Sequence, residues 1–508
     1  MKKMNNTSPK PKKPSKKHAQ AGAGRPASKG GSGYSASKGT TGRGTSKAAA
    51  DRGERKDAAG RTGSKGAAGR SISKGVAGRG ASKPTAAAAP KKNSLCPVSG
   101  ACGACQSIDL PYEKQLASKQ EYIEKLFEGV APREAVRPIL GMEEPFHYRN
   151  KVISPYAPGK KLSASRPAGK GSAKTGAGKG SGKNALQREI LTGMYAKGTH
   201  KLVPTDTCLL ENQVAKKITL VVRDLMARFG IEPYNEDTGA GFMRHAVVRV
   251  GHESGEVLVT LVTNGDTFPA SKAFCRELVK RVPQVTTVVQ NINTRQTNVI
   301  LGDQERTLYG PGFILDTLCG LSFRISSHSF YQVNATQTEI LYEAAIALAG
   351  FDGTQTAIDA YCGTGTIGLV AAKRGAARVI GVDNVASAIA DARLNARHNG
   401  VENAEFVAAD AGAFMRELAA DRAGLSSVED LVLLMDPPRA GSTPEFLDAA
   451  IAMAPSCIVY ISCNPETQVR DVRYLAQAGY QIEVLQAVDM FPHTEHVESI
   501  ALITRGEK

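Results

Sequence analysis

The sequence predicts an α/β protein in which an open, mostly parallel sheet follows a smaller α/β or α+β domain. From Phe330 onward, strand-like runs alternate with helical stretches, which is the pattern of parallel strands joined by crossover helices. A glycine-rich turn follows the first of these strands, and a basic repeat of period nine fills the first 93 residues. We therefore expect three parts: a tail at 1–93, a central domain at 94–325 and a C-terminal domain at 326–508.

The tail is strongly basic and offers almost no apolar side chains. Residues 1–93 hold 23 Lys and Arg against three acids, a charge of +20 in a chain whose net charge is +17. The repeat consensus is Gly-Arg-x-x-Ser-Lys-Gly, seen clearly at Gly60 and Gly69. Such units cannot bury a face against their neighbours, so we expect disorder. The tail is either a sequence-tolerant RNA tether or a solubilising segment.

A second basic run, residues 159–184, interrupts the central domain with seven Lys and Arg and no acid. We expect it to be a disordered insertion at a hairpin turn. The rest of the chain, without this run and the tail, carries −10. The affinity for a polyanion is therefore expected to come mostly from the two basic segments.

Composition excludes several classes of protein. No window approaches the ~18 consecutive apolar residues of a membrane span, and no apolar region follows the N-terminal lysines as in a signal peptide. Nine unevenly spaced cysteines are too few for a disulfide scaffold in 508 residues, and they fit a reducing compartment. We expect a cytoplasmic monomer with no membrane partner.

The central domain is expected to combine an early helix, several strands and one later helix. Residues 112–129 predict the first helix because Leu116, Ile123 and Phe127 share one face. Runs rich in β-branched residues predict the strands. The expected strands are 148–156, 189–195, 246–250, 257–263, 286–291 and 298–301, with the later helix at 271–281.

The C-terminal domain is expected to form the parallel sheet, whose ligands bind at the carboxyl ends of the strands. The expected strands are 355–360, 378–383, 404–407, 430–435, 457–462 and 481–488, and the helices include 386–398 and 445–454.

A glycine-rich motif runs from Asp359 to Gly368 after the first strand of this sheet. Its glycines permit a tight turn and let a ligand approach the backbone at the start of the next helix. Asp383, at the end of the next strand, is placed to hold a ribose. Because dinucleotide-binding proteins share this pattern, the motif indicates a nucleoside-containing cofactor without identifying it.

Two further strand ends carry chemistry. The fourth strand ends in Asp436-Pro437-Pro438-Arg439, typical of methyltransferases that act on a planar nitrogen, and the fifth places the Cys463 thiol at the same edge. A cysteine suits methylation of uracil position 5, which is a poor nucleophile until a thiolate adds to position 6. A base must then take the position-5 proton, and Glu498 is a candidate.

Three cysteines, Cys96, Cys102 and Cys105, form a Cys-x5-Cys-x2-Cys run on a glycine-containing loop. Three soft thiolates at this spacing can wrap one metal centre, and a fourth ligand can come from far along the chain. From spacing alone, zinc and an iron–sulphur cluster are comparable, and unligated core cysteines are the alternative. Cys275, Cys319, Cys362 and Cys457 are interpreted as packing residues.

These motifs together resemble the RNA uracil-5 methyltransferases, over residues 94–158 and 185–508. The similar segments are Ser327-His328-Ser329-Phe330-Tyr331-Gln332-Val333-Asn334, Asp359-Ala360-Tyr361-Cys362-Gly363, Asp436-Pro437-Pro438-Arg439, Ile461-Ser462-Cys463-Asn464-Pro465 and Asp489-Met490-Phe491-Pro492-His493-Thr494 with Glu498. The resemblance implies a class I S-adenosylmethionine-dependent methyltransferase domain.

The resemblance also implies roles for individual residues. Contacts to S-adenosylmethionine are implied for Gln332, Tyr361, Asp383 and Asp436. It makes Cys463 the nucleophile and Glu498 the proton acceptor. It further places a fourth metal ligand at Cys208 beside Cys96, Cys102 and Cys105, and favours a 4Fe-4S cluster similar to that of the 23S ribosomal RNA branch, since the tRNA branch lacks these cysteines.

The function we expect is S-adenosylmethionine-dependent formation of 5-methyluridine in 23S ribosomal RNA through a covalent Cys463 adduct. A tRNA uracil-5 methyltransferase is one alternative, and an RNA-binding assembly factor with a vestigial site is another. The simultaneous presence of Cys463 and Glu498 is evidence against the vestigial site. Many ribosomal members carry a small β-barrel before the cysteine run, whereas this chain carries the basic tail there, which weakens assignment to one particular uridine.

Overall fold

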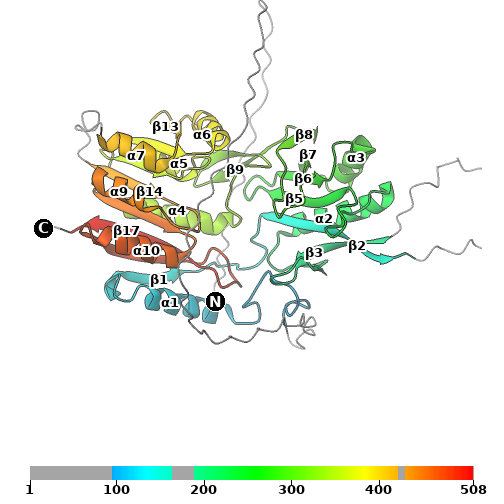
Figure 1. The fold of residues 1–508 in the computed structure, drawn as a ribbon, viewed down its shortest axis with the longest axis horizontal. Coiled ribbons are helices and arrows are strands. Elements are labelled where there is room, and N and C mark those ends of the chain that lie inside the picture. Colours follow the sequence, from blue (N-terminus) through cyan, green and yellow to red (C-terminus); the bar gives the residue numbers. More distant parts are fainter. Residues whose placement is uncertain (1–93, 163–187, 421–429, 507–508) are drawn as a thin grey trace, which may run out of the picture. The chain divides into compact units, whose positions relative to one another are not determined.

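The computed structural model describes residues 94–162, 188–420 and 430–506 (Figure 1). The predictions for the tail at 1–93 and for residues 163–184 of the basic insertion concern parts of the chain outside these ranges. Within the described ranges, no helix is both long enough and apolar enough to cross a membrane.

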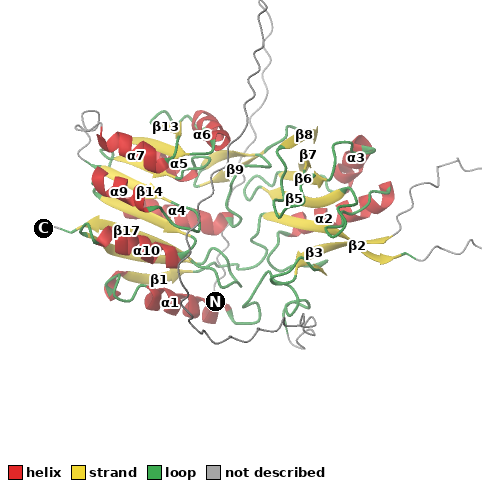
Figure 2. Cartoon of the chain, viewed as in Figure 1, coloured by secondary structure: helices red, strands yellow, loops and turns green. Residues whose placement is uncertain are grey.

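An eight-stranded sheet carries most of the C-terminal part of the chain (Figure 2). Five neighbouring strands, β15 to β13, run parallel, while β17 is antiparallel to both of its neighbours and β1 is parallel to β16. In spatial order the strands are β1 (Val136–Leu140), β16 (Tyr480–Val488), β17 (Glu498–Arg505), β15 (Cys457–Ser462), β14 (Leu431–Met435), β11 (Thr356–Ala360), β12 (Arg378–Asp383) and β13 (Ala404–Ala408).

Helices cover both faces of this sheet, which explains why β11 and β14 are buried along their whole length. Alternate residues of β11 face opposite ways: Ala357 packs in one core cluster and Ile358 in the other. One face is covered by α4 (Ala335–Ala349), α5 (Thr366–Lys373) and α6 (Ala386–His398). The other is covered by α1 (Tyr112–Leu126), α7 (Ala411–Ala420), α9 (Pro444–Met453) and α10 (Pro465–Ala476).

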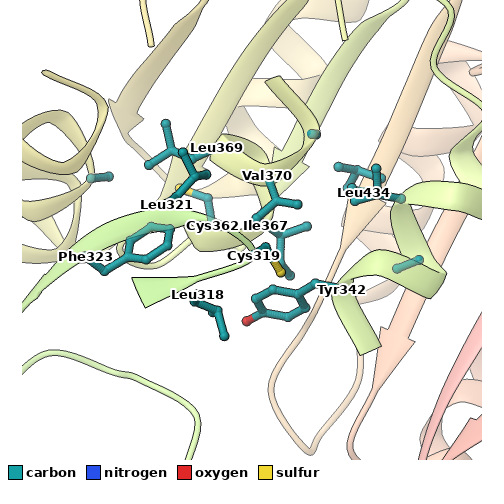
Figure 3. Packing of buried hydrophobic residues seen from close by; sticks show 14 of the residues in the cluster. Leu318, Cys319, Leu321, Phe323, Tyr342, Cys362, Ile367, Leu369, Val370 and Leu434 are labelled. Carbon is teal, nitrogen blue, oxygen red and sulfur yellow. The ribbon is translucent and has the colours of Figure 1, made fainter. Parts of the chain in front are cut away.

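A two-stranded hairpin, β9 (Ile314–Leu318) and β10 (Leu321–Ile325), joins the core on the α5 face. Figure 3 shows Leu321 and Phe323 of the hairpin among the same buried side chains as Leu369 of α5. The hairpin thus belongs to the hydrophobic core of the eight-stranded sheet.

A seven-stranded sheet forms the central region. Helices α2 (Gln213–Phe229) and α3 (Ser271–Arg281) pack on one of its faces, and the only parallel pair among its strands, β6 with β7, is connected by α3. In spatial order the strands are β4 (Leu202–Pro204), β3 (Arg188–Tyr195), β2 (Lys151–Lys161), β5 (Met243–Val250), β6 (Val257–Thr263), β7 (Val285–Ile292) and β8 (Gln304–Tyr309).

Most elements lie where the sequence predicts them, including the antiparallel hairpin β2–β3 that flanks the insertion. The strand expected at 298–301 is wrong. That segment is a loop, because side chains take up its backbone carbonyls: Asn293 donates to the carbonyls of Val299 and Ile300 at 2.7 and 2.9 Å. The neighbouring strand β8 begins only at Gln304.

The two sheets do not divide the chain at residue 325. Helix α1 and strand β1, from the region expected to be central, join the eight-stranded sheet, where β1 pairs with β16. A buried ion pair of 2.6 Å between Lys119 of α1 and Asp489 fixes this arrangement. The chain therefore enters the C-terminal sheet, leaves it for the seven-stranded sheet, and returns.

Candidate active site

The glycine-rich motif forms a tight turn between β11 and α5. Tyr361 adopts a φ of 65°, and the turn is closed by Asp383, whose Oδ2 accepts a hydrogen bond of 3.0 Å from the Gly363 amide. A side chain at Gly365 would place its Cβ 2.8 Å from the ring of Phe406, so only glycine fits. The turn therefore brings backbone and the Asp383 carboxylate to the edge where a nucleoside is expected.

Two carboxyls lie near this turn: Asp359 is buried and Asp436 is partly buried. Asp359 accepts from the Gly368 amide at 2.8 Å through Oδ2, while its Oδ1 is buried without a hydrogen-bond partner in the described structure. Burial raises the pKa of Asp359 to about 7 and that of Asp436, after β14, also to about 7. A buried polar atom without a partner beside a glycine turn fits a site that a polar cofactor completes.

The remaining predicted cofactor residues lie on different elements. Tyr361 leaves β11 with its hydroxyl 3.5 Å from Ser442 Oγ and its ring 5.1 Å from that of Phe446. Gln332 lies between β10 and α4, and its carbonyl accepts a hydrogen bond of 3.2 Å from the Asn150 side chain. Gln332 is thus tied to the central region, whereas Tyr361, Asp383 and Asp436 come from the strand ends.

Cys463 and Glu498 are brought together by the antiparallel pair β15–β17. Cys463 follows β15, and Glu498 begins β17 and is 3% exposed. Burial raises the pKa of Glu498 to about 8, and the nearby charge of Asp436 adds to this. Burial also raises the pKa of the Cys463 thiol, with Glu498 and Asp436 as the next causes. The three groups therefore lie within electrostatic reach of one another.

Arg439 is a member of this site to which the sequence assigned no role. Its positive charge and a hydrogen bond to the thiol act to lower the pKa of Cys463, against the larger effect of burial. Its backbone carbonyl accepts hydrogen bonds from Asn464 Nδ2 at 3.0 Å and Thr467 Oγ1 at 3.3 Å, which ties the loop after β14 to the start of α10. The signal was its place directly after Asp436-Pro437-Pro438.

A cavity of about 600 Å³ opens beside Cys463. Its walls come from α1, from the segment that follows Cys105 and from the segment before β17. The residues that line it include Gln106, Ser107, Tyr122, Cys463 and His496. The segment that directly follows the cysteine run, with Gln106 and Ser107, therefore forms one wall of the cavity beside Cys463, which the sequence did not indicate.

The turn before β17 is held in place from several sides. His493 has a φ of 67°, and its amide donates to Gln115 Oε1 at 2.9 Å. Its carbonyl accepts from the amides of Gln106 and Ser107 at 3.1 and 3.2 Å. The cysteine loop, α1 and the approach to Glu498 are thus joined through one residue.

The four predicted metal ligands come into one neighbourhood. Burial raises the pKa of Cys105 to about 12, followed by the charges of Cys102, Cys208 and Cys96, so the four thiols interact electrostatically. In the described residues no three His, Cys, Asp or Glu side chains form a preassembled metal-binding group. The structure therefore shows proximity of the thiols and no metal geometry.

The fold and the edge of the sheet that carries Asp383 and Asp436 define a class I S-adenosylmethionine-dependent methyltransferase. A solved structure with the same fold is that of Pyrococcus abyssi tRNA (uracil-54, C5)-methyltransferase in complex with S-adenosyl-L-homocysteine. It is 27% identical, with a TM-score of 0.61 over 79% of this chain and 86% of that chain.

Relatives and a family model agree with this fold. An uncharacterised RNA methyltransferase of Halalkalibacterium halodurans is 37% identical over 421 residues, covering 82% of this chain and 84% of the relative. One of Listeria monocytogenes serotype 4b is 39% identical over 409 residues, covering 80% and 83%. The tRNA (uracil-5-)-methyltransferase family model matches residues 316–506. The chain belongs to the RNA uracil-5-methyltransferase family and is an S-adenosylmethionine-dependent enzyme.

Proposed function

We propose that the protein forms 5-methyluridine in 23S ribosomal RNA, with Cys463 as nucleophile and Glu498 as proton acceptor. The observation that carries the chemistry is the meeting of Cys463, Glu498 and Asp436 beside an open cavity. A base inside a stacked helix cannot present position 6 to a thiolate, so the target uridine must be unpaired or turned out of the stack.

The chain's own groups account for the bond to position 6 and for the position-5 proton. The Cys463 thiolate adds to position 6 of uracil, which makes position 5 nucleophilic. S-adenosylmethionine, when bound, supplies an electrophilic methyl group for position 5. Glu498 then accepts the position-5 proton, and elimination of Cys463 from position 6 restores the ring and frees the enzyme. Arg439 supports the first step by favouring the thiolate.

The proposed cofactor contacts follow from the strand ends. Asp383 is at the position where a carboxylate holds ribose hydroxyls, and Tyr361 lies at the same turn. We include Asp436 and Gln332 in the cofactor site because the family resemblance implies that they contact S-adenosylmethionine.

Ribosomal RNA is favoured as substrate by the four cysteines. Cys96, Cys102, Cys105 and Cys208 would together hold a 4Fe-4S cluster, a group that uses four thiolates. Cys96, Cys105 and Cys208 pack in one cluster although they come from two distant segments, and the effect of the other three thiols on the pKa of Cys105 is consistent with four cysteines close together, as such a group requires. The cluster would then stabilise the loop that leads into the cavity wall at Gln106 and Ser107. Transfer RNA is the second candidate, favoured by the similarity to the Pyrococcus abyssi tRNA methyltransferase.

Substrate choice is tested by methyl incorporation into protein-free 23S ribosomal RNA and into unmodified tRNA, with each RNA at equal uridine concentration. We expect kcat/KM for 23S ribosomal RNA to be at least about 100-fold higher than for tRNA. Two favourable contacts that each contribute about tenfold would give a ratio of this size. Preference for tRNA would overturn the ribosomal assignment and leave the family membership intact.

The cysteine proposal predicts iron in the purified protein. Anaerobically prepared protein should contain about four iron atoms per chain and absorb broadly near ~400 nm. Cys105→Ser should lose both signals. The matched control is Cys275→Ser, a buried cysteine packed against α2 and the central sheet, which should retain them. Zinc in place of iron, or no metal in either protein, would contradict the cluster.

A further inference from the structure

Two cationic residues face each other across neighbouring strands of the central sheet without a carboxylate partner. Lys151 of β2 pairs in register with Arg249 of β5. Arg249 is 5% exposed and Lys151 is partly buried. In the described residues neither side chain forms an ion pair, and the Arg249 Nε has no hydrogen-bond partner. Buried like charges side by side are costly unless an anion joins them.

The register shows which face of the sheet carries this pair. Val152 and Val248, each adjacent in sequence to one member, pack in the core beneath α2 and α3. Side chains alternate along a strand, so Lys151 and Arg249 lie on the opposite face. Arg249 is also in register with Leu258, which packs in the same core cluster as the β9–β10 hairpin. The pair therefore faces the catalytic part of the chain.

The surroundings connect the pair to the segment between β10 and α4, which carries the proposed cofactor residue Gln332. The Arg249 guanidinium donates to the carbonyl of Ser329, and Asn150, next to Lys151, donates to the carbonyl of Gln332. Between these two anchors, Phe330 is 69% exposed, unusual for a phenylalanine in a folded protein. An exposed aromatic ring beside cations is the combination that binds single-stranded nucleic acid.

Burial disfavours the positive charge on both members of the pair. Burial, followed by the charge of Arg249, lowers the pKa of Lys151 to about 8. Burial lowers the pKa of Arg249 to about 10. The chain outside the two basic segments carries −10, so the net charge there does not favour RNA, and holding a phosphate at a defined place needs a local group of cations.

We propose that Lys151 and Arg249 bind one backbone phosphate of the RNA substrate close to the reacting uridine. This proposal rests on the function proposed above. The phosphate would accept hydrogen bonds from both cations, and Phe330 would contact the adjoining base. The anion could instead be the carboxylate of S-adenosylmethionine, and the experiment distinguishes these two sources.

The test uses Lys151→Met in the full chain, because methionine keeps the volume and removes the charge. Binding of a ten-nucleotide oligouridylate is measured across a range of salt concentrations, together with a methylphosphonate version whose backbone is uncharged. The variant should bind the phosphodiester RNA about tenfold more weakly at low salt, with the slope of log K against log salt reduced by about 0.7. Its affinity for the methylphosphonate RNA should match that of the wild type.

Three controls make the outcome decisive. Lys280→Met, an exposed lysine on α3 against the other face of the sheet, should leave affinity and salt slope unchanged. Lys151→Met should also raise the thermal midpoint by about 2 °C or more, since an uncompensated buried cation is removed. Affinity for S-adenosylmethionine should not change.

The proposal is overturned if Lys151→Met keeps the wild-type affinity and salt slope, if it loses affinity for the cofactor instead of RNA, or if its thermal midpoint falls together with its affinity. Because the readout is binding of RNA without turnover, failure of this proposal is distinguishable from failure of the proposed methylation, which the substrate comparison tests separately.

Discussion

Replacing Cys463 with alanine should reduce methyl transfer by at least about 10⁴-fold, while binding of RNA and of S-adenosylmethionine stays near the wild-type level. The thiol is the group that makes position 5 of uracil nucleophilic, and no other described side chain at the cavity is a cysteine. The measurement is single-turnover transfer of labelled methyl groups to saturating RNA, so that a change in affinity cannot imitate a change in rate.

The matched control for this loss is Cys457→Ala. Cys457 lies at the opposite end of the same strand, β15, and packs against the core without lining the cavity. Its replacement should leave the rate within about threefold of wild type, a packing effect only. If the Cys463→Ala protein methylated RNA at a rate comparable with that of Cys457→Ala, Cys463 could not be the nucleophile.

Glu498→Gln should stop the reaction after the methyl group has been transferred. The amide cannot accept the position-5 proton, so Cys463 cannot be eliminated and the enzyme remains covalently attached to methylated RNA. We expect multiple turnover to fall about 10³-fold, together with an enzyme–RNA complex that survives denaturing electrophoresis. Glu483→Gln is the control: Glu483 is exposed on the neighbouring strand β16 and should form no such complex.

The raised pKa of Glu498 adds a pH signature to the same experiment. Burial raises this pKa to about 8, so the base is mostly protonated below that value and the wild-type rate should rise with pH through 8. Burial also raises the pKa of the Cys463 thiol, so the rate should continue to rise above pH 8 as the thiolate forms. An unfolded glutamate ionises near ~4.3, so the folded protein binds more protons between the two values and loses stability as pH rises. Glu498→Gln should therefore unfold at a higher temperature than wild type at pH 8 and differ little at pH 4. If Glu498→Gln forms no trapped complex and retains multiple turnover, another group accepts the position-5 proton.

Local patterns predicted the parallel strands because each is a short apolar run bounded by turn residues. The turn from Asp359 to Gly368 could also be predicted from local sequence, because glycines directly after a strand are typical of a ligand-binding turn. Strand-end chemistry then placed Asp436 and Cys463 at one edge, and the structure brings them within electrostatic reach of Glu498.

Long-range pairing was beyond these patterns. Strand β1 adds to the far edge of the eight-stranded sheet beside β16, more than 300 residues later in the chain, and nothing in its own five residues specifies that partner. The buried ion pair between Lys119 and Asp489 likewise joins residues that are far apart in the chain, so local patterns do not predict it. For this reason the sequence did not show that α1 and the segment after Cys105 line the cavity beside Cys463.

The false strand at 298–301 has a different cause. Its composition suits a strand, but the Asn293 side chain donates to two of its carbonyls, and Asn291 hydrogen-bonds to the backbone of Gly302 directly after it. Side-chain donors and main-chain donors compete for the same carbonyls, and strand propensity does not take this competition into account. Gly302 closes this loop so tightly that a Cβ there would lie 1.8 Å from the Ile292 carbonyl oxygen.

The most direct measurement is a map of 5-methyluridine in the ribosomal RNA and tRNA of cells that carry either the wild-type gene or one encoding Cys463→Ala. We predict 5-methyluridine in 23S ribosomal RNA that disappears in the Cys463→Ala cells, while the modification of tRNA is unchanged. Persistence of every 5-methyluridine in both RNAs would contradict the proposed reaction, and selective loss from tRNA would contradict the proposed substrate.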